Sequence, residues 1–163
     1  MSQLQREIKQ RSPFRNPSHE ATVALLRTSD DVARFIAPVI EAEAVSGEQY
    51  NVLRILRGAD GQGLPTLEIA SRMIQRTPGI TRLLDKLEAK SLVRRKRCPE
   101  DRRQVLCWIT DRGLELLSRV DEPLNNAEIE AFAGLGSVEL RRFIGLMGRV
   151  RAHLNAKFKG EKP

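Results

Sequence analysis

Positive charge is concentrated in one stretch of this sequence. Residues 90–103 hold seven lysines and arginines against two acidic residues, an excess of five positive charges in fourteen residues. The whole chain of 163 residues has a formal net charge of +7 and a pI of about 10.0. Since lysine and arginine supply most of the non-specific affinity for nucleic acids by neutralising phosphates, this stretch predicts a polyanionic partner.

The segment before this stretch has the pattern of an amphipathic helix. Its apolar positions recur every three or four residues, which predicts a buried stripe of Ile80, Leu83, Leu84 and Leu87. Thr77 followed by Pro78 predicts the start of the helix, with threonine as the N-cap and proline at the first helical position. The polar residues of the helix would therefore point away from the core.

A helix that enters the major groove of DNA needs such a polar face. It requires hydrogen-bond donors near its N-terminal end, a cation that reaches guanine or phosphate, and an unobstructed leading turn. We expect Thr77, Thr81 and Arg82 to contact the groove, and Arg76 and Lys86 to contact phosphates. The full candidate set is Arg76, Thr77, Pro78, Gly79, Thr81, Arg82 and Lys86. An ordinary solvated helix face is the competing interpretation of these residues.

The sequence that follows favours DNA over a merely solvated face. A strand begins at Leu92 and Val93, a loop covers residues 98–103, and residues 105–109 form a second strand rich in β-forming residues. A hairpin tipped with arginines beside a helix-turn-helix has the form of a wing, whose arginine can enter the minor groove. The wing candidates are Arg95, Arg97, Asp101, Arg102 and Arg103. Asp101 would hold one of the two arginines that follow it, and the sequence leaves open which one is free for DNA.

Shorter elements upstream must position this helix and hairpin. Ser46 and Gln49 have the spacing of a capping box, which starts a helix that ends at Gly58. Residues 59–65 are expected to form a loop, and Thr66 is expected to cap the next helix. The side chains of that helix expected to pack inward are Leu67, Ala70 and Ile74.

Long amphipathic helices flank this central region. Ser18 is expected to cap the first of them, and Pro38 to kink it or to end it. Thr110 is expected to cap the second, in which Pro123 predicts a bend or a break, and Ser137 is expected to cap the last. Apolar stripes of this kind usually form a core, and here that core could lie between two chains.

The central region resembles a known family. The run LEIASRM, followed by TPGITRLLDKLEAKSLVRRKRCPEDRRQVLCWITDRGLELL, is similar to the multiple-antibiotic-resistance regulator (MarR) family of winged-helix transcription factors. The resemblance is strong over residues 67–117 and extends to the flanks only in the order of the helices. The family usually has glycine where this chain has Ser91, and serine tolerates a left-handed backbone poorly. That helix end is therefore expected to be strained or differently shaped.

The resemblance implies a homodimer built from the terminal helices, which binds a pseudo-palindromic operator with one recognition helix in each half-site. It also implies a wing arginine in the minor groove, Arg102 or Arg103, and often a small anionic or phenolic effector. The expected fold class is mainly α with a small β-wing, a winged helix-turn-helix domain plus N- and C-terminal dimerisation helices. The expected organisation is a flexible basic N-terminal arm over residues 1–17, a helical dimerisation region over residues 18–45 and 111–160, and the DNA-binding domain over residues 46–110.

The expected function is that of a sequence-specific transcriptional regulator, a ligand-responsive repressor that binds double-stranded DNA. A non-specific architectural DNA-binding protein and a winged-helix module for protein contacts are the alternatives. No Ser/His/Asp grouping, metal-ligand spacing or phosphate-binding glycine motif is present, so we expect no enzyme, no catalytic residue, no metal and no cofactor. Because no apolar run approaches the roughly 18 residues of a membrane span and no signal peptide is visible, we expect a cytoplasmic protein without a membrane partner.

Two cysteines raise the question of redox sensing. Cys98 follows Lys96 and Arg97, whose charges would favour a reactive thiolate, and an incidental thiol is the alternative. In the expected hairpin, Cys98 lies opposite roughly Arg103, and Cys107 lies opposite roughly Arg94. At about 3.3 Å per residue the two thiols would be on the order of 10 Å apart or more, which is too far for a disulfide within the chain.

Overall fold

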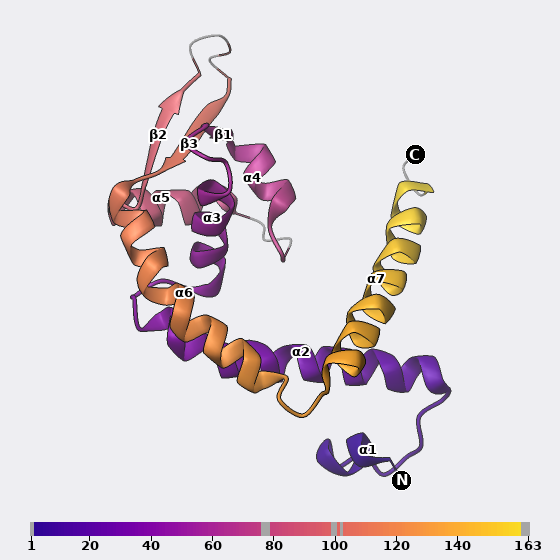
Figure 1. Ribbon diagram of the computed structural model, residues 1–163. Helices are drawn as coiled ribbons and strands as arrows, with labels where there is room; N and C mark the ends of the chain where they lie inside the picture. The colour runs from indigo at the N-terminus through magenta and orange to yellow at the C-terminus, as the bar shows by residue number, and fades with distance from the viewer. Residues whose placement is uncertain (1, 76–78, 99–100, 102, 161–163) are drawn as a thin grey trace. The chain divides into compact units, whose positions relative to one another are not determined.

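The computed structural model describes residues 2–75, 79–98, 101 and 103–160 (Figure 1). The described helices are α1 (Gln3–Glu7), α2 (Pro17–Glu41), α3 (Gly47–Arg57), α4 (Thr66–Arg72), α5 (Ile80–Ala89), α6 (Asp111–Ala131) and α7 (Ser137–Gly160). The strands are β1 (Leu64–Pro65), β2 (Val93–Arg97) and β3 (Val105–Ile109). This arrangement confirms the expected fold class, mainly α with a small β-wing.

The chain divides into two compact units, of which the first ends at Ala127 and the second begins at Glu128. The first unit contains the sheet and most of the helices. The second contains the end of α6 and all of α7, where the rings of Phe132 and Phe143 lie 6.2 Å apart between centroids. Among the described helices, none combines the length and the apolar character needed to cross a membrane.

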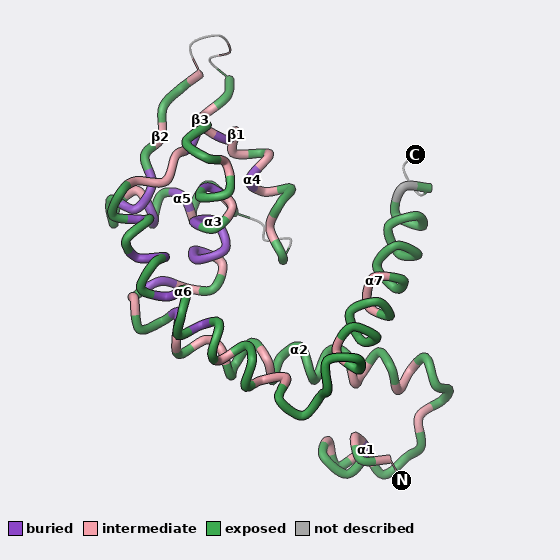
Figure 2. The backbone as a smooth tube through the Cα atoms, viewed as in Figure 1, coloured by how far each residue is buried: buried purple, intermediate pink, exposed green. Residues whose placement is uncertain are grey.

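The core of the first unit surrounds α3, whose Val52 and Leu53 are completely buried. Figure 2 shows buried residues gathered where α3, α5 and the sheet meet. Fully or almost fully buried side chains reach this core from four other elements: Ile69 of α4, Leu84 and Leu87 of α5, Cys107 of β3, and Leu117 and Val120 of α6. The core is therefore aliphatic, and it packs against the buried face of α5.

The sheet has the strand order β1-β3-β2, and both strand pairs are antiparallel. Leu64 and Pro65 pair with Cys107 and Leu106, so the prediction that residues 59–65 form only a loop was wrong for the last two. Proline is tolerated there because β1 is an edge strand, where one missing backbone donor faces no partner. In the hairpin, Arg95 lies opposite Cys107. The expected register, with Cys107 opposite roughly Arg94, was therefore off by one residue.

The starts of the helices partly follow the predictions. Ser46 and Gln49 form the predicted capping box of α3, and Gly58 is its C-cap. Thr110 caps α6 as predicted, because its Oγ1 accepts a hydrogen bond from the Gly113 backbone N–H at 3.1 Å. Ser137 is the first residue of α7 rather than its cap, since the Leu140 N–H donates to the carbonyl of Gly136.

The prolines within the long helices do not end them. Asn16, and not Ser18, caps α2 by accepting a hydrogen bond from the His19 backbone N–H at 2.9 Å, with Pro17 at the first helical position. The helix then continues through Pro38 to Glu41. It does so because neighbouring apolar side chains pack against the core and offset the lost backbone bond: Ile36, Val39 and Ile40. The prediction at Pro123 was a bend or a break, and α6 runs through this residue without a break.

The orientation of α4 differs from the prediction. Leu67 and Ile74 were expected to pack inward, yet they are 83% and 77% exposed, whereas Ile69 is completely buried. Thr66 does not cap the helix, because its Oγ1 donates instead to the carbonyl of Val105 in β3 at 3.3 Å. The pairing of β1 and Thr66 with β3 fixes how this short helix is rotated about its axis. The periodicity of apolar residues within the seven residues of α4 contains no information about this strand pairing.

Candidate nucleic-acid interface

The two faces of α5 lie as the sequence predicted. Leu84 and Leu87 are completely buried, and Ile80 packs against the core from a partly buried position. The opposite side of the helix exposes Asp85 together with every described member of the predicted recognition set: Gly79, Thr81, Arg82 and Lys86. Within the described residues, Arg82 and Lys86 form no ion pair. They are free to meet phosphates or base edges.

The first described residue at this end of α5 is Gly79, which has a φ of +103° and acts as the N-cap. A left-handed backbone favours glycine, so this position is a turn residue. The helix consequently begins at Ile80, two residues after the predicted first position at Pro78. Arg76, Thr77 and Pro78 lie outside the described residues.

Arg95, predicted to contact DNA from the wing, is held by α5. Its Nη2 lies 2.6 Å from Oδ1 of Asp85 and 2.6 Å from Oε2 of Glu88, and its Nε lies 2.9 Å from the same Glu88 oxygen. The hydrogen bonds with Glu88, and then those with Asp85, raise the pKa of Arg95. With its side chain only 21% exposed, Arg95 fastens the hairpin to α5 and compensates Asp85 on the polar face.

Asp101 accepts two hydrogen bonds close to the tip of the wing. Its Oδ1 accepts a hydrogen bond from the Arg103 backbone N–H at 3.0 Å, and its Oδ2 accepts one from the Gln104 side chain at 3.1 Å. Asp101 thus holds the main chain of Arg103 and not its guanidinium. The side chains of Arg97 and Arg103 are exposed, and neither has an ion pair within the described part of the chain. Arg102 lies outside the described residues.

The other face of the hairpin carries an arrangement that the sequence analysis missed. Arg94 stacks over the ring of Trp108, its cross-strand neighbour, at 4.6 Å from the ring centroid. The indole also packs against Gly63, where an added Cβ would lie 2.4 Å from ring carbons. Strand alternation could have revealed this pair, because Arg94 and Trp108 share a face once the register is known.

Ser91 joins α5 to β2 in the left-handed conformation, with a φ of +58°. The Ser91 N–H donates to the carbonyl of Glu88, and the Leu92 N–H donates to that of Leu87, which is the Schellman pattern of a helix end. Thr110 Oγ1 donates to the Ser91 carbonyl at 2.8 Å and ties this turn to the start of α6. The helix end therefore has the shape that glycine gives it, with a serine in the strained position.

Both cysteines are free thiols. Cys107 of β3 is completely buried, and burial raises the pKa of its thiol. Cys98 is half-buried, and its backbone N–H donates to the Gln104 carbonyl at 2.9 Å, so its partner is Gln104 and not Arg103. Among the residues that the structure describes, no three His, Cys, Asp or Glu side chains gather as metal ligands.

Comparison with known proteins identifies the family. The model of the MarR family matches residues 45–105, which include α3, α4, α5 and β2. A crystal structure of a MarR transcription factor from Planctomyces limnophilus is 38% identical, covers 83% of this chain and 98% of its own, and has a TM-score of 0.65. The chain belongs to the MarR family. It is a MarR-type transcription regulator with a DNA-binding winged-helix fold.

More distant structures share this fold. A mutant MarR from E. coli complexed with operator DNA is 20% identical, with a TM-score of 0.76 over 85% of this chain and 99% of its own. BpsR from Bordetella bronchiseptica, whose DNA binding is described as regulated by 6-hydroxynicotinic acid, is also 20% identical. Its TM-score is 0.72 over 81% of this chain and 98% of its own. At such identities the likeness shows the fold that these proteins have in common with the present MarR-family chain.

Proposed function

We propose that this MarR-family regulator is a homodimeric, ligand-responsive repressor that acts in the cytoplasm on a pseudo-palindromic operator. It acts by binding and not by catalysis. The observation that carries the proposal is the exposed polar face of α5 beside a hairpin with uncompensated arginines, the two being fastened together by Arg95. If the polar face of α5 served only as a solvated surface, its rigid attachment to a basic hairpin would have no function.

The residues divide between reading sequence and supplying affinity. Thr81 and Arg82 on the exposed face of α5 contact bases, and Lys86 contacts a phosphate. Arg97 and Arg103 bind the backbone or the minor groove from the wing. Four further candidates from the sequence keep their proposed roles although they lie outside the described residues: Arg76, Thr77, Pro78 and Arg102.

The homodimer is supported by apolar side chains that the single chain leaves uncovered. On α7 the exposed residues are Val138, Phe143, Ile144, Leu146, Val150, Leu154 and Phe158. Leu25, Leu26 and Phe35 are exposed on α2. Exposed apolar surface on this scale marks an interaction site, and a second copy of the chain would bury it. Residues 18–45 and 111–160 are therefore the proposed dimerisation region, around a DNA-binding domain over residues 46–110.

Binding selection tests the proposal directly. The purified protein is mixed with sheared DNA of its own genome, bound fragments are sequenced, and the enriched site is footprinted. We expect a discrete two-fold site bound with a strong dependence on salt. Arg82→Ala should lose discrimination between this site and random duplex, while Arg54→Ala on the exposed side of α3 should bind as the unmodified protein does.

Two results would overturn the proposal. Uniform protection of every fragment would indicate an architectural DNA-binding protein. Little DNA affinity at either of two salt concentrations would indicate a module for protein contacts, because phosphate binding by cations must weaken as salt rises.

A further inference from the structure

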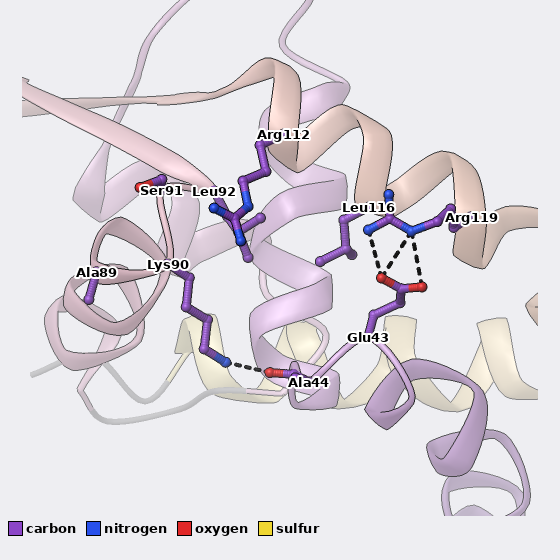
Figure 3. A pocket seen from close by; sticks show the side chains of 9 residues that line it. All are labelled: Glu43, Ala44, Ala89, Lys90, Ser91, Leu92, Arg112, Leu116 and Arg119. Carbon is purple, nitrogen blue, oxygen red and sulfur yellow. Dashed lines mark hydrogen bonds and ion pairs between the residues drawn. The ribbon is translucent and has the colours of Figure 1, made fainter.

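A hydrogen-bonded junction joins the end of α5 to the start of α6. The turn after α5 contributes the carbonyls of Ser91 and Leu92, and Thr110 directly precedes α6. The Thr110 hydroxyl donates to the Ser91 carbonyl at 2.8 Å, and the Thr110 backbone N–H donates to the Leu92 carbonyl at 3.1 Å. Figure 3 labels Ser91 and Leu92 on this turn, and Arg112 on the first turn of α6. The helix proposed to contact bases is thus tied to a helix of the proposed dimerisation region.

The Thr110 hydroxyl forms hydrogen bonds in both directions at this junction. Besides donating to Ser91, its Oγ1 accepts a bond from the Gly113 backbone N–H at 3.1 Å. A hydroxyl can do both, because it has one hydrogen and two lone pairs. One side chain therefore links the first turn of α6 to the turn that follows α5. Gly113 allows this close approach, since an added Cβ would lie 2.5 Å from the Leu92 carbonyl oxygen.

Further contacts of α6 reach elements other than α5. Arg119 pairs with Glu43 in the turn between α2 and α3, and Asp121 pairs with Arg57 at the end of α3. Leu117 is completely buried in the shared core. Apolar burial has no preferred direction, whereas a hydrogen bond requires an alignment of donor and acceptor. The bonds of Thr110 are therefore suited to fix the direction of α6 relative to α5.

A small change of direction at this junction is amplified along α6. With a rise of about 1.5 Å per residue, the 21 residues of α6 extend about 30 Å, so a tilt of about 5° moves the far end by roughly 3 Å. Successive base pairs of DNA are about 3.4 Å apart along the helix axis. In a dimer joined through such helices, this tilt changes the separation of the two recognition helices by an amount comparable to one base-pair step.

We propose that Thr110 is a positioning residue that sets the half-site spacing of the operator, through the hydroxyl that joins the turn after α5 to α6. The inference rests on the proposed function, because spacing has a meaning only for a dimer on a two-fold site. The competing role is that of a helix cap alone, which needs the bond from the Gly113 N–H but not the bond to Ser91. Because the two roles require different hydrogen bonds, substitutions separate them.

Three substitutions at residue 110 remove these bonds selectively. Thr110→Ser keeps the hydroxyl and both of its bonds. Thr110→Asp keeps the cap, because an ionised carboxylate accepts the Gly113 N–H, but it cannot donate to the Ser91 carbonyl. Thr110→Val has nearly the shape of threonine and loses both bonds. Ser118→Ala is the matched control, because the Ser118 hydroxyl donates within α6, to the carbonyl of Glu115.

Duplexes of different spacing test the positioning role. Fluorescence anisotropy measures affinity for the selected DNA site, for the same site with its centre lengthened or shortened by one base pair, and for a single half-site. The wild type, Thr110→Ser and Ser118→Ala should prefer the natural spacing by about tenfold or more. Thr110→Asp and Thr110→Val should lose about fivefold or more of this preference, with half-site affinity within about twofold of the wild type. A wild-type preference in Thr110→Asp would overturn the inference and indicate a cap alone.

A distance measurement without DNA tests the same coupling. Spin labels are attached at Lys86→Cys on α5 and Glu115→Cys on α6, in a chain that also carries Cys98→Ser, while the buried Cys107 stays unlabelled. Dilution with unlabelled protein restricts the measurement to pairs within one chain. Thr110→Asp and Thr110→Val should displace or broaden the distribution of distances, and Thr110→Ser should not. An unchanged distribution in Thr110→Asp would overturn the coupling.

The outcomes distinguish this inference from the proposed function. If the wild type prefers one spacing and Thr110→Asp keeps that preference, the role of Thr110 is overturned and the proposed function stands. If the wild type binds every spacing equally, the proposed function is removed, and the inference about spacing is removed with it. Circular dichroism and thermal unfolding verify that each variant folds, so a loss of preference is not a loss of structure.

Discussion

Arg95 of β2 and Glu88 of α5 are joined by three hydrogen bonds. The guanidinium Nε and Nη2 lie 2.9 and 2.6 Å from Oε2 of Glu88, and the Arg95 backbone N–H donates to Oε1 at 3.1 Å. The carboxylate therefore holds both the side chain and the main chain of the strand. This contact fixes the angle between the hairpin and α5. It also neutralises the charge of Arg95, which the sequence analysis had predicted to contact DNA.

The salt dependence of DNA binding should distinguish Arg95, which positions the hairpin, from Arg103, which is proposed to contact DNA. Arg95→Ala is expected to lower DNA affinity while leaving the slope of log K against log salt nearly unchanged, because Arg95 neutralises no phosphate. Arg103→Ala, from the exposed wing tip, should reduce the steepness of that slope by about one. Fluorescence anisotropy at several salt concentrations measures both variants on the same duplex. A slope change of about one in Arg95→Ala would mean that Arg95 contacts DNA after all.

Ser91→Gly should stabilise the protein by about 1 kcal/mol, because glycine adopts a left-handed backbone without the steric cost that serine bears. The surrounding hydrogen bonds involve only main-chain atoms of residue 91, so they remain in the variant. Urea unfolding followed by circular dichroism provides the measurement. Ser118→Gly in the middle of α6 is the matched control and should destabilise by about half a kcal/mol. Loss of stability in Ser91→Gly would contradict the assigned strain.

Gly113→Ala should destabilise the protein by about 1–3 kcal/mol through overpacking. An added Cβ would lie 2.5 Å from the carbonyl oxygen of Leu92 and 2.7 Å from Cγ1 of Ile109. The helix start would have to move away from the junction of α5 and β2. Gly145→Ala in α7 meets no atom within 4 Å in the single chain and should leave the fold of the first unit unchanged. Thermal unfolding gives the midpoint of each variant. Equal midpoints would argue against a close contact between residue 113 and the carbonyl of Leu92.

Thiol labelling should separate the two cysteines. Cys107 is buried and its pKa is raised by desolvation, so iodoacetamide should modify it only after unfolding. Cys98 is half-buried and should react in the folded protein. Peptide mapping after timed labelling gives both rates. A rate for Cys98 no faster than that of a free thiol in a short peptide would remove the redox hypothesis.

The raised pKa of Cys107 also predicts a pH dependence of stability. Below the ordinary thiol pKa near 9.0, the folded and unfolded states are both protonated, and the full stability is present. As pH rises above that value, the unfolded chain releases its proton first, so the free energy of unfolding falls until the folded pKa is passed. Urea unfolding at several alkaline pH values compares the wild type with Cys107→Ala. The variant should lack the part of the fall in the free energy of unfolding that comes from this thiol. An identical pH dependence in both proteins would show that Cys107 does not contribute to it.

The sequence by itself determined the elements that have strong local signals. Ser46 and Gln49 marked a helix start, Thr110 marked another, and the spacing of Leu84 and Leu87 separated the faces of α5 correctly. The unusual Ser91 was also visible, because the family that the chain resembles usually has glycine at this helix end, and Ser91 does adopt the left-handed backbone. In each case the determining contacts lie within a few residues of one another along the chain.

Only the tertiary structure decided which residues meet across elements. The rotation of α4 depends on the pairing of β1 with β3, and so Leu67 is exposed where periodicity predicted burial. The role of Arg95 depends on a hairpin register that differs from the expected one by a single residue, which moves a strand side chain to the opposite face. A pocket lined by Ala44, Lys90 and Arg112, among others, joins three separate segments of the sequence (Figure 3). Such contacts depend on how whole elements pack against one core, and no local pattern in the sequence contains that information.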